Sequence, residues 1–472
     1  MLRAHIARTK IVCTIGPASS TPSVLRNLMD AGLNVARINF SHGTHEQHAA
    51  MIATVRGLSK DLKRPVAILC DLQGPRIRVG YFAEPVALVT GNDVVLVPED
   101  HAKPGEIPVT YDALPDDVDI GDRILMDDGL LEMVVLDVEA PRVRARVLHG
   151  GWLRSHKGIN LPGVLVSAPS ITDKDRQDIE LAVDQGVDYL ALSFVRRAKD
   201  IEALRALVPP KMLLVAKIEK DTALANIESI IRASDAVMVA RGDLGVELPF
   251  EEVPGAQKRI IALANAFGRP VITATQMLES MIANPRPTRA EASDVANAIL
   301  DGTDAIMLSA ETATGAYPRL AVDAMRRIIA EMETHPIPRT ILAGTKRQPG
   351  EVVETEEAIA GATVAAARVL GAPLVVVFTK SGFSARVISS YRPDVPILAL
   401  TDLPQTCQQL ALVWGVLPEL VTPATSYDEM FANARAAMER RKLAGKGDRV
   451  IVTAGVPFGA PGTTNFMKVE QL

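Results

Sequence analysis

The sequence predicts an α/β protein, a (β/α)8 TIM barrel with an inserted all-β lid domain and a C-terminal α/β domain. Three observations predict this fold. Short, continuously apolar runs alternate with amphipathic helical stretches, which is the pattern of parallel strands covered on both faces. The runs number eight, the count that closes such a barrel, and a turn-rich segment interrupts the series after the third run. The runs span residues 11–15, 35–38, 66–69, 189–192, 213–218, 236–239, 271–274 and 305–308.

The segments between the first runs carry signals for the start and end of helices. Thr21 and Pro22 offer an N-cap and a proline at the first helical position, and Gly32 offers a C-cap. Thr44 and Gln47 have the spacing of a capping box before the next amphipathic stretch. These signals predict the first two helices of the barrel.

A long segment separates the third apolar run from the fourth, where a single helix would suffice. Residues 85–148 alternate in short strand-like bursts with turn signals such as Gly91-Asn92 and Asp128-Gly129, which predicts a small all-β domain. We expect this lid domain to span residues 73–165, between the two parts of the barrel at 1–72 and 166–338. An insert that leaves and returns at the end of a strand would hang over the barrel mouth.

The last part of the chain predicts a separate domain. Residues 339–354 are predicted to be a linker, and residues 355–472 a C-terminal α/β domain. Its expected helices lie at 359–370 and 426–440, and its expected buried strands at 374–378 and 449–452.

Composition excludes several classes of function. The net charge is −5 and aromatic residues make up 4% of the chain, so no basic or stacking surface for nucleic acid or for an anionic membrane is indicated. No stretch approaches the ~20 apolar residues of a membrane span, and the N-terminus lacks a signal peptide. The scattered cysteines Cys13, Cys70 and Cys407 are expected to be reduced. We therefore expect a cytoplasmic protein.

Polar residues follow six of the eight apolar runs. Active sites of such barrels form where the carboxyl ends of the strands meet, so these residues are expected to share one cavity. Lys217 and Glu219 point the same way along a strand, and Glu219 and Asp243 offer the oxygen ligands that Mg²⁺ prefers. A cation and two carboxylates at one spot suit phosphoryl-transfer or enolate chemistry. The residues are Arg37, Asn39, Ser41, His42, Asp71, Arg76, Arg78, Lys217, Glu219, Arg241, Gly242, Asp243, Thr275, Gln276, Ser309 and Glu311.

Less specific interpretations are open for individual residues. Lys217 and Glu219 could form an ordinary internal ion pair, Asn39 or Ser41 could cap a helix, and His42 could be a surface residue. Their joint occurrence at strand ends favours an active site. The chain has no G-x-x-x-x-G-K-[ST] and no G-x-G-x-x-G after a strand, so neither a Walker nor a Rossmann nucleotide site is indicated.

The chain resembles pyruvate kinase over nearly its whole length. Several of the similar stretches are specific on their own, and together they occur in order. They are KIVCTIGP (10–17), ARINFSH (36–42), DLQGPRIR (71–78), KGINLPG (157–163), AKIE (216–219), MVARGDLGVE (238–247), TATQMLESM (273–281), PTRAE (287–291) and MLSAET (307–312).

The resemblance implies transfer of the phosphoryl group of phosphoenolpyruvate to ADP, giving pyruvate and ATP in the last step of glycolysis. It implies that Lys217 stabilises the charge of the transition state, and leaves open whether Thr275 or Ser309, through water, delivers the proton to the enolate. The implied catalytic residues are Lys217, Arg37, Thr275 and Ser309, and the implied substrate-binding residues are Arg37, Lys217, Gly242, Asp243 and Thr275. The implied nucleotide contacts are Asn39, His42, Arg78 and Lys157. The implied ligands of Mg²⁺ or Mn²⁺ are Glu219 and Asp243.

The resemblance also bears on a monovalent cation. In the potassium-dependent form of the family, the positions of Asn39, Ser41, Asp71 and the Leu72 carbonyl bind K⁺, and an acidic residue occupies the position of Arg76. Members with lysine at that position do without K⁺. Arg76 resembles the second form, so we expect K⁺ to be dispensable.

Regulation, assembly and rival functions complete the expectations. The family binds a sugar-phosphate or nucleotide effector in the C-terminal domain, here at Thr379, Lys380, Ser381 and Ser384, although a polar turn explains that segment equally well. The family is usually a homotetramer.

Two other functions are alternatives to pyruvate kinase activity. One is a metal-dependent lyase or aldolase acting on an enolpyruvate or oxo-acid substrate, and the other is a non-catalytic sensor of phosphorylated metabolites.

Overall fold

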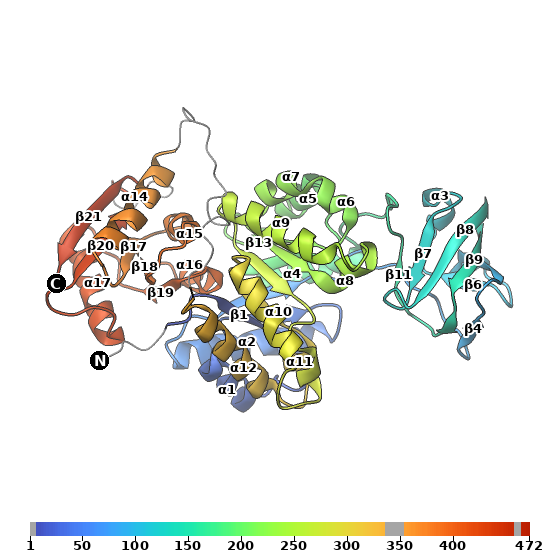
Figure 1. Ribbon diagram of the computed structural model, residues 1–472, viewed down its shortest axis with the longest axis horizontal. Coiled ribbons are helices and arrows are strands. Elements are labelled where there is room, and N and C mark those ends of the chain that lie inside the picture. Colours follow the sequence, from blue (N-terminus) through green and yellow to red (C-terminus); the bar gives the residue numbers. More distant parts are fainter. Residues whose placement is uncertain (1–5, 336–353, 457–463) are drawn as a thin grey trace.

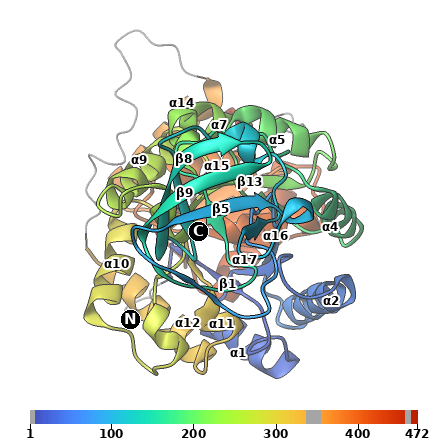
Figure 2. The same ribbon diagram turned by 90° about the vertical axis from the view of Figure 1, so that its right-hand side faces the viewer.

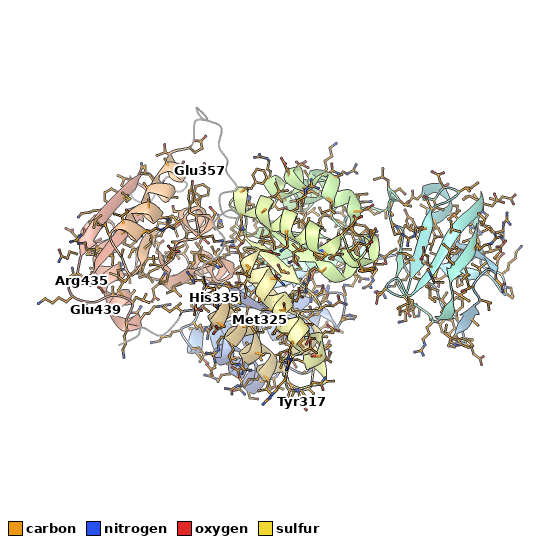
Figure 3. All side chains as sticks on the ribbon, viewed as in Figure 1. Tyr317, Met325, His335, Glu357, Arg435 and Glu439 are labelled. Atoms are coloured by element: carbon orange, nitrogen blue, oxygen red, sulfur yellow. The ribbon has the colours of Figure 1, made fainter. Side chains whose placement is uncertain are left out.

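The computed structural model describes residues 6–335, 354–456 and 464–472. The chain forms three bodies in a row, each filled with its own side chains, with the barrel in the middle, the lid at one end and the C-terminal domain at the other (Figure 1, Figure 3). The linker predicted at 339–354 lies outside the described residues, except for Glu354.

The eight predicted strands form one closed, all-parallel barrel, so the predicted fold class is confirmed. The order around the barrel is β1-β16-β15-β14-β13-β12-β3-β2. The strands are β1 (Lys10–Thr14), β2 (Val35–Asn39), β3 (Ala67–Asp71), β12 (Tyr189–Leu192), β13 (Leu213–Ile218), β14 (Ala236–Ala240), β15 (Val271–Ala274) and β16 (Ala305–Leu308).

Helices surround the barrel and pack their apolar faces against its outer surface. The Thr44–Gln47 capping box is confirmed, and Gly32 ends the first helix with a φ of 138°. Thr21 occupies the predicted N-cap position and Pro22 the first helical position, which confirms the prediction, although the Thr21 side chain makes no capping hydrogen bond. The helices are α1 (Pro22–Ala31), α2 (His45–Asp61), α4 (Asp173–Asp184), α5 (Ala198–Arg205), α6 (Asp221–Ala225), α7 (Ile227–Ala233), α8 (Arg241–Glu247), α9 (Val253–Ala266), η2 (Glu279–Ile282), α10 (Arg289–Leu300), α11 (Ala310–Ala313) and α12 (Pro318–Met332).

The lid is an all-β domain inserted after β3. Its six-stranded sheet has the order β11-β7-β8-β9-β5-β6, with a separate β10-β4 pair, around its own apolar core. Viewed from the lid end, β5, β8 and β9 pass in front of the ring of barrel helices (Figure 2). The elements are β4 (Val86–Leu88), β5 (Asp93–Pro98), η1 (Glu99–His101), β6 (Ile107–Val109), α3 (Leu114–Asp117), β7 (Arg123–Met126), β8 (Leu131–Glu139), β9 (Arg142–His149), β10 (Gly151–Leu153) and β11 (Ile159–Asn160).

The C-terminal domain is a five-stranded sheet of order β19-β18-β17-β20-β21, in which only β21 runs antiparallel to its neighbour. Helices pack on the sheet around two apolar cores. The elements are α14 (Thr355–Val369), β17 (Val375–Phe378), α15 (Phe383–Ser390), β18 (Ile397–Thr401), α16 (Pro404–Gln409), η3 (Leu410–Leu412), β19 (Val416–Leu420), α17 (Tyr427–Arg441), β20 (Arg449–Ala454) and β21 (Phe466–Gln471).

The C-terminal domain closes the end of the barrel opposite the lid. Leu412 of η3 packs into the apolar cluster inside the barrel, and the hydroxyl of Tyr189 donates to the carbonyl of Gln409 at 2.7 Å. The buried Arg392 forms an ion pair with Asp304, with 2.8 Å between Nη1 and Oδ1. These contacts cover the end of the barrel opposite the lid, so among the described residues the lid end is the more open one. Among the described residues, no helix combines the length and the apolar character needed to cross a bilayer.

Candidate active site

A buried ion cluster lies at the lid end of β3 and β13. The ammonium of Lys217 is 2.8 Å from Oε1 of Glu219 and 3.2 Å from Oδ1 of Asp71. Strand register brings Asp71 near Lys217: Ala191 of β12 pairs with Asp71 of β3 on one side and with Val215 of β13 on the other, and Lys217 lies two residues beyond Val215 on the same face of β13. The carboxylates of Asp71 and Glu219 are each 1% exposed, so they interact in a medium that screens charge weakly.

Arg37 contacts the same carboxylate from the other side. Its Nε donates to Oδ2 of Asp71 at 2.8 Å, and its Nη2 lies 2.6 Å from the same oxygen. A hydrogen bond from Nη1 to Thr14 Oγ1, at 2.9 Å, fixes the plane of the guanidinium group. Arg37 and Lys217 thus converge on Asp71, and both present donors suited to phosphate oxygens.

The charges in the cluster act on one another's pKa values. Burial by itself would lower the pKa of Lys217, but Asp71 and Glu219 outweigh burial and raise it, so the ammonium stays charged. Burial raises the pKa of Glu219 to about 7, opposed by Lys217 and reinforced by the negative charge of Asp243. Burial would raise the pKa of Asp71, but Lys217 and Arg37 hold it below its usual range. Strongly perturbed groups gathered in one cleft are typical of an active site.

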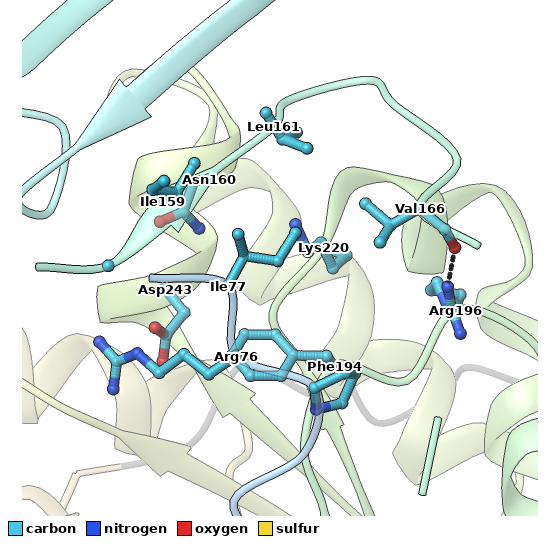
Figure 4. Close-up of a pocket in the computed structure, with 12 residues that line it drawn as sticks. Arg76, Ile77, Ile159, Asn160, Leu161, Val166, Phe194, Arg196, Lys220 and Asp243 are labelled. Carbon is cyan, nitrogen blue, oxygen red and sulfur yellow. Dashed lines mark hydrogen bonds between the residues drawn. The ribbon is translucent and has the colours of Figure 1, made fainter. Parts of the chain in front are cut away.

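Asp243 faces this cluster from the first turn of α8. It lines a pocket between the barrel mouth and the neck of the lid, together with Arg76, Phe194, Lys220 and Asn160 (Figure 4). The structure therefore brings the ammonium at position 217 and the acidic groups at 219 and 243 together beneath the lid.

The segment after β15 approaches α8 closely. The amide of Gly242 donates to Thr275 Oγ1 at 2.8 Å, and a Cβ atom at position 242 would lie 3.4 Å from that oxygen. Thr275 and Gln276 have φ values of 69° and 55°, in the left-handed region that side chains other than glycine rarely adopt. Strained backbone of this kind concentrates at ligand-binding sites.

Ser309 follows β16 on the same side of the barrel. Its amide donates to Glu311 Oε2 at 2.6 Å, while its hydroxyl oxygen is buried with no hydrogen-bond partner among the described residues. Glu311 is fully buried and also accepts from the amide of Leu278 at 3.1 Å, so it supports the backbone instead of facing the pocket. Arg241 likewise turns away, because it pairs with Asp294 at 2.7 Å.

Comparisons with known proteins agree with this geometry. A family model described as the barrel domain of pyruvate kinase matches residues 6–322, and one described as its alpha/beta domain matches residues 357–470. The chain belongs to the pyruvate kinase family.

Similar proteins cover 98% of the chain. Pyruvate kinase from Geobacillus stearothermophilus is 47% identical over 473 residues, covering 98% of this chain and 80% of the relative. Pyruvate kinase from Agrobacterium vitis is 45% identical over 468 residues, covering 98% and 97%. A crystal structure of a pyruvate kinase from Cryptosporidium parvum superimposes with a TM-score of 0.94 at 38% identity, covering 98% of this chain and 96% of that one.

Family membership establishes the activity. The chain is a phosphotransferase with pyruvate kinase activity in glycolysis, and phosphoenolpyruvate and ADP are the substrates that this activity implies. The lyase or aldolase and the non-catalytic sensor are thereby set aside. Pyruvate kinases generally use Mg²⁺. Within the described ranges no group of three or more His, Cys, Asp or Glu side chains forms a metal cage.

The predicted nucleotide contacts lie in two places. Asn39 and His42 lie at the barrel mouth, and neither Asn39 nor Ser41 caps the following helix, because Thr44 does so. Arg78 and Lys157 lie in the neck and body of the lid, where Lys157 pairs with Asp127 at 2.6 Å. Lys157 therefore points within the lid in this arrangement and does not reach the ion cluster.

Three of the four groups predicted to bind K⁺, those of Asn39, Asp71 and Leu72, already have hydrogen-bond or ion-pair partners in the protein. Asn39 Oδ1 accepts from the amide of Ser41 at 3.1 Å, and the Leu72 carbonyl accepts from the Ser193 hydroxyl at 2.7 Å. Asp71 is paired with two cations, as described above. Arg76 is exposed at the edge of the pocket that Asp243 lines (Figure 4).

Two residues of the cluster were missed by the sequence analysis. Ser193 accepts from Lys217 Nζ at 2.7 Å, and the amide of Phe194 donates to Glu219 Oε2 at 2.6 Å. Phe194 holds a φ of 55°, so its amide is aimed by an unfavourable backbone conformation. The signal that could have found them was position, because Ser193 and Phe194 directly follow the fourth apolar run.

The predicted effector segment forms the turn between β17 and α15. Thr379 Oγ1 accepts from the amide of Gly382 at 3.0 Å, and Ser381 Oγ accepts from the amide of Phe383 at 3.4 Å. Lys380 pairs with Asp402, and Ser384 shares a hydrogen bond with Thr464. The four residues surround the N-terminus of α15, and each has a partner within the domain.

Proposed function

We propose that the buried cluster is the site of phosphoryl transfer, with Arg37 and Lys217 binding the phosphoryl group of phosphoenolpyruvate. The observation that carries this proposal is the convergence of two cations on Asp71, beside Glu219 and facing Asp243. Glu219 and Asp243 are the proposed ligands of Mg²⁺, or of Mn²⁺ in its place. Oε1 of Glu219 supports this role, because it is buried and its polar partner among the described residues is the ammonium of Lys217.

Each residue then has a physical task. In a loose transition state negative charge spreads over the oxygens of the transferring group, and the fixed charges of Lys217 and Arg37 stabilise it without reorganising. Bound Mg²⁺ would add positive charge shared between protein and substrate oxygens. The amides of Gly242 and Asp243, with Thr275, would hold the substrate carboxylate.

The proton for the enolate would come from the part of the barrel mouth where Thr275 and Ser309 follow β15 and β16. The buried, unpartnered hydroxyl of Ser309 supports a place for a water molecule there. Closure of the lid would exclude bulk water, which would otherwise compete with ADP for the phosphoryl group. The same closure would bring Arg78 and Lys157 toward a nucleotide held at Asn39 and His42.

A coupled assay tests the activity. Pyruvate formed from phosphoenolpyruvate is measured with and without ADP, in the presence of Mg²⁺. Pyruvate formation that requires ADP, with ATP formed in equal amount, is the expected result. Pyruvate released at the same rate without ADP would contradict phosphoryl transfer to a nucleotide.

Metal binding should depend on pH through Glu219. Its carboxyl, with a pKa of about 7 in the metal-free protein, must lose its proton to bind a cation, so affinity is present above pH 7 and is lost as the pH falls through 7. We expect Mn²⁺ affinity to fall about tenfold per pH unit below that point. Titrations followed by the electron paramagnetic resonance of free Mn²⁺ at pH 7.5 and 5.5 measure this. Equal affinity at both values would argue against Glu219 as a ligand.

Three finer properties are also proposed. K⁺ is dispensable for the activity of this chain. The place of the activity in glycolysis favours a cytoplasmic location. A phosphorylated effector would bind at the turn formed by Thr379, Lys380, Ser381 and Ser384. Thermal shifts with a sugar phosphate or a nucleoside monophosphate, compared between the wild-type protein and Lys380→Ala, test the effector site.

A homotetramer is the proposed assembly. An apolar hollow between α10 and α12 supports a subunit contact on that face, and analytical ultracentrifugation measures the assembly directly. The residues that line this hollow include Pro287, Ala292, Ala296, Ala324, Ile328 and Met332.

A further inference from the structure

Glu247, at the end of α8, is a buried carboxylate outside the cluster described above. Its side chain is 0% exposed. Oε1 accepts from Lys220 Nζ at 2.5 Å and from Asn160 Nδ2 at 2.9 Å. Oε2 is buried without a hydrogen-bond partner among the described residues. One carboxylate thus joins the end of a barrel strand, a helix at the barrel mouth and the lid strand β11.

The two members of this ion pair lie next to the two proposed metal ligands. Lys220 directly follows Glu219 in the chain. Glu247 comes four residues after Asp243 on α8, and residues spaced in this way lie on the same face of a helix. The Lys220–Glu247 pair therefore links the segment that carries one carboxylate to the helix that carries the other.

Helix α8 needs such a link to hold its orientation. It spans seven residues, contains Gly242 and Gly245, and has no side-chain hydrogen bond at its N-cap. Helices this short are unstable alone, and glycine lowers helix stability further. Arg241 anchors the start of α8 through Asp294, and Glu247 anchors its end through Lys220.

We propose that the Lys220–Glu247 ion pair, here called the brace, positions Glu219 and Asp243 for a shared divalent cation. Asn160 attaches the neck of the lid to this brace through its hydrogen bond to Glu247. The inference rests on the proposed role of Glu219 and Asp243 as metal ligands. Lys220, Asn160 and Asp243 line one pocket (Figure 4), so the brace borders the site without belonging to the ion cluster. Residues that orient metal ligands typically contribute 10–100-fold to metal affinity.

Direct metal binding tests the brace. Lys220→Met would leave the carboxylate of Glu247 buried and unpaired, so the main variant is the double substitution Lys220→Met with Glu247→Met, which replaces the pair by apolar side chains of similar length. Such replacements are often neutral for stability. We expect its affinity for Mn²⁺, measured by electron paramagnetic resonance without substrate, to fall about tenfold or more. The Mg²⁺ concentration for half-maximal activity should rise in proportion, with kcat at saturating Mg²⁺ changed less than about threefold.

Three matched variants complete the experiment. Arg56→Met removes the partner of another fully buried carboxylate, Asp188, at 2.8 Å and at the opposite end of the barrel, and should leave Mn²⁺ affinity unchanged. Asn160→Ala removes only the lid contact and should keep Mn²⁺ affinity within about twofold of the wild type. Lys220→Arg keeps a cation opposite Glu247, so this single variant should retain most of the wild-type affinity for Mn²⁺.

The outcomes separate the brace from the ligand assignment. Asp243→Asn should abolish measurable Mn²⁺ binding, and unchanged binding in this variant would overturn the proposed ligands. Loss of binding in Asp243→Asn together with wild-type affinity in the double variant would overturn the brace alone. A tenfold loss in Asn160→Ala would also overturn it, because the lid contact and not the ion pair would then hold the ligands in place.

Discussion

Replacing Lys217 by Met is expected to lower kcat by about three orders of magnitude or more, the range seen when a transition-state cation is removed. The ammonium lies 2.8 Å from Oε1 of Glu219 and 3.2 Å from Oδ1 of Asp71, so it has a fixed position from which to meet the phosphoryl group. Methionine fills the space of the lysine side chain, but it offers no positive charge to the negative charge that develops on the phosphoryl oxygens in the transition state. Steady-state kinetics at saturating phosphoenolpyruvate, ADP and Mg²⁺ measure the effect.

Stability must be measured on the same variant. Removing one partner of a buried ion pair typically costs about 3–5 kcal/mol, because the other charge stays buried. Asp71 keeps Arg37 as a partner, so the cost falls mainly on Glu219. Chemical unfolding shows whether the variant is folded at the assay temperature, and Lys199→Met, at an exposed position, is the control. A folded Lys217→Met enzyme with kcat within tenfold of the wild type would exclude Lys217 from the chemistry.

The barrel could be predicted because its strands leave a strong local signal. Strands covered on both faces must be apolar throughout, and runs such as 213–218 and 271–274 coincide with β13 and β15. The capping box at Thr44 was equally local. Thr21 shows the limit of such signals, since a residue can occupy the capping position while its side chain makes no capping bond.

The contacts within the site could not be predicted from local patterns. The sequence places Asp71 and Lys217 at the ends of the third and fifth apolar runs, but the pairing of Asp71 with two cations depends on the barrel register, in which β12 lies between β3 and β13. Arg241 looked like a mouth residue and instead pairs with Asp294, more than fifty positions along the chain. Ser193 was missed because its importance comes from its neighbours in space and not from its residue type.

Charge balance explains the expectation for K⁺. The ion cluster together with Asp243 and Arg76 contains six charged side chains, three of each sign when Glu219 is deprotonated, and Lys220 in the same pocket is paired with Glu247. A further monovalent cation is therefore not needed for neutrality before substrate and Mg²⁺ bind. An acidic residue in place of Arg76 would remove one positive charge and add one negative charge, which favours binding of a cation nearby. The six are Arg37, Lys217 and Arg76 on one side, and Asp71, Glu219 and Asp243 on the other.

Arg76→Glu should therefore make the enzyme depend on K⁺. A unit charge at the edge of such a pocket contributes about 1–2 kcal/mol after screening, and the substitution changes the charge by two. Activity in K⁺-free buffer should fall on the order of a hundredfold and recover when KCl is added, while the wild-type enzyme changes little.

Arg76→Lys is the matched control, because it keeps the positive charge at position 76. Assays at constant ionic strength, with tetramethylammonium in place of K⁺, measure the dependence. A large loss of wild-type activity without K⁺ would contradict this account, and would show that Asn39, Ser41, Asp71 and the Leu72 carbonyl still require the ion.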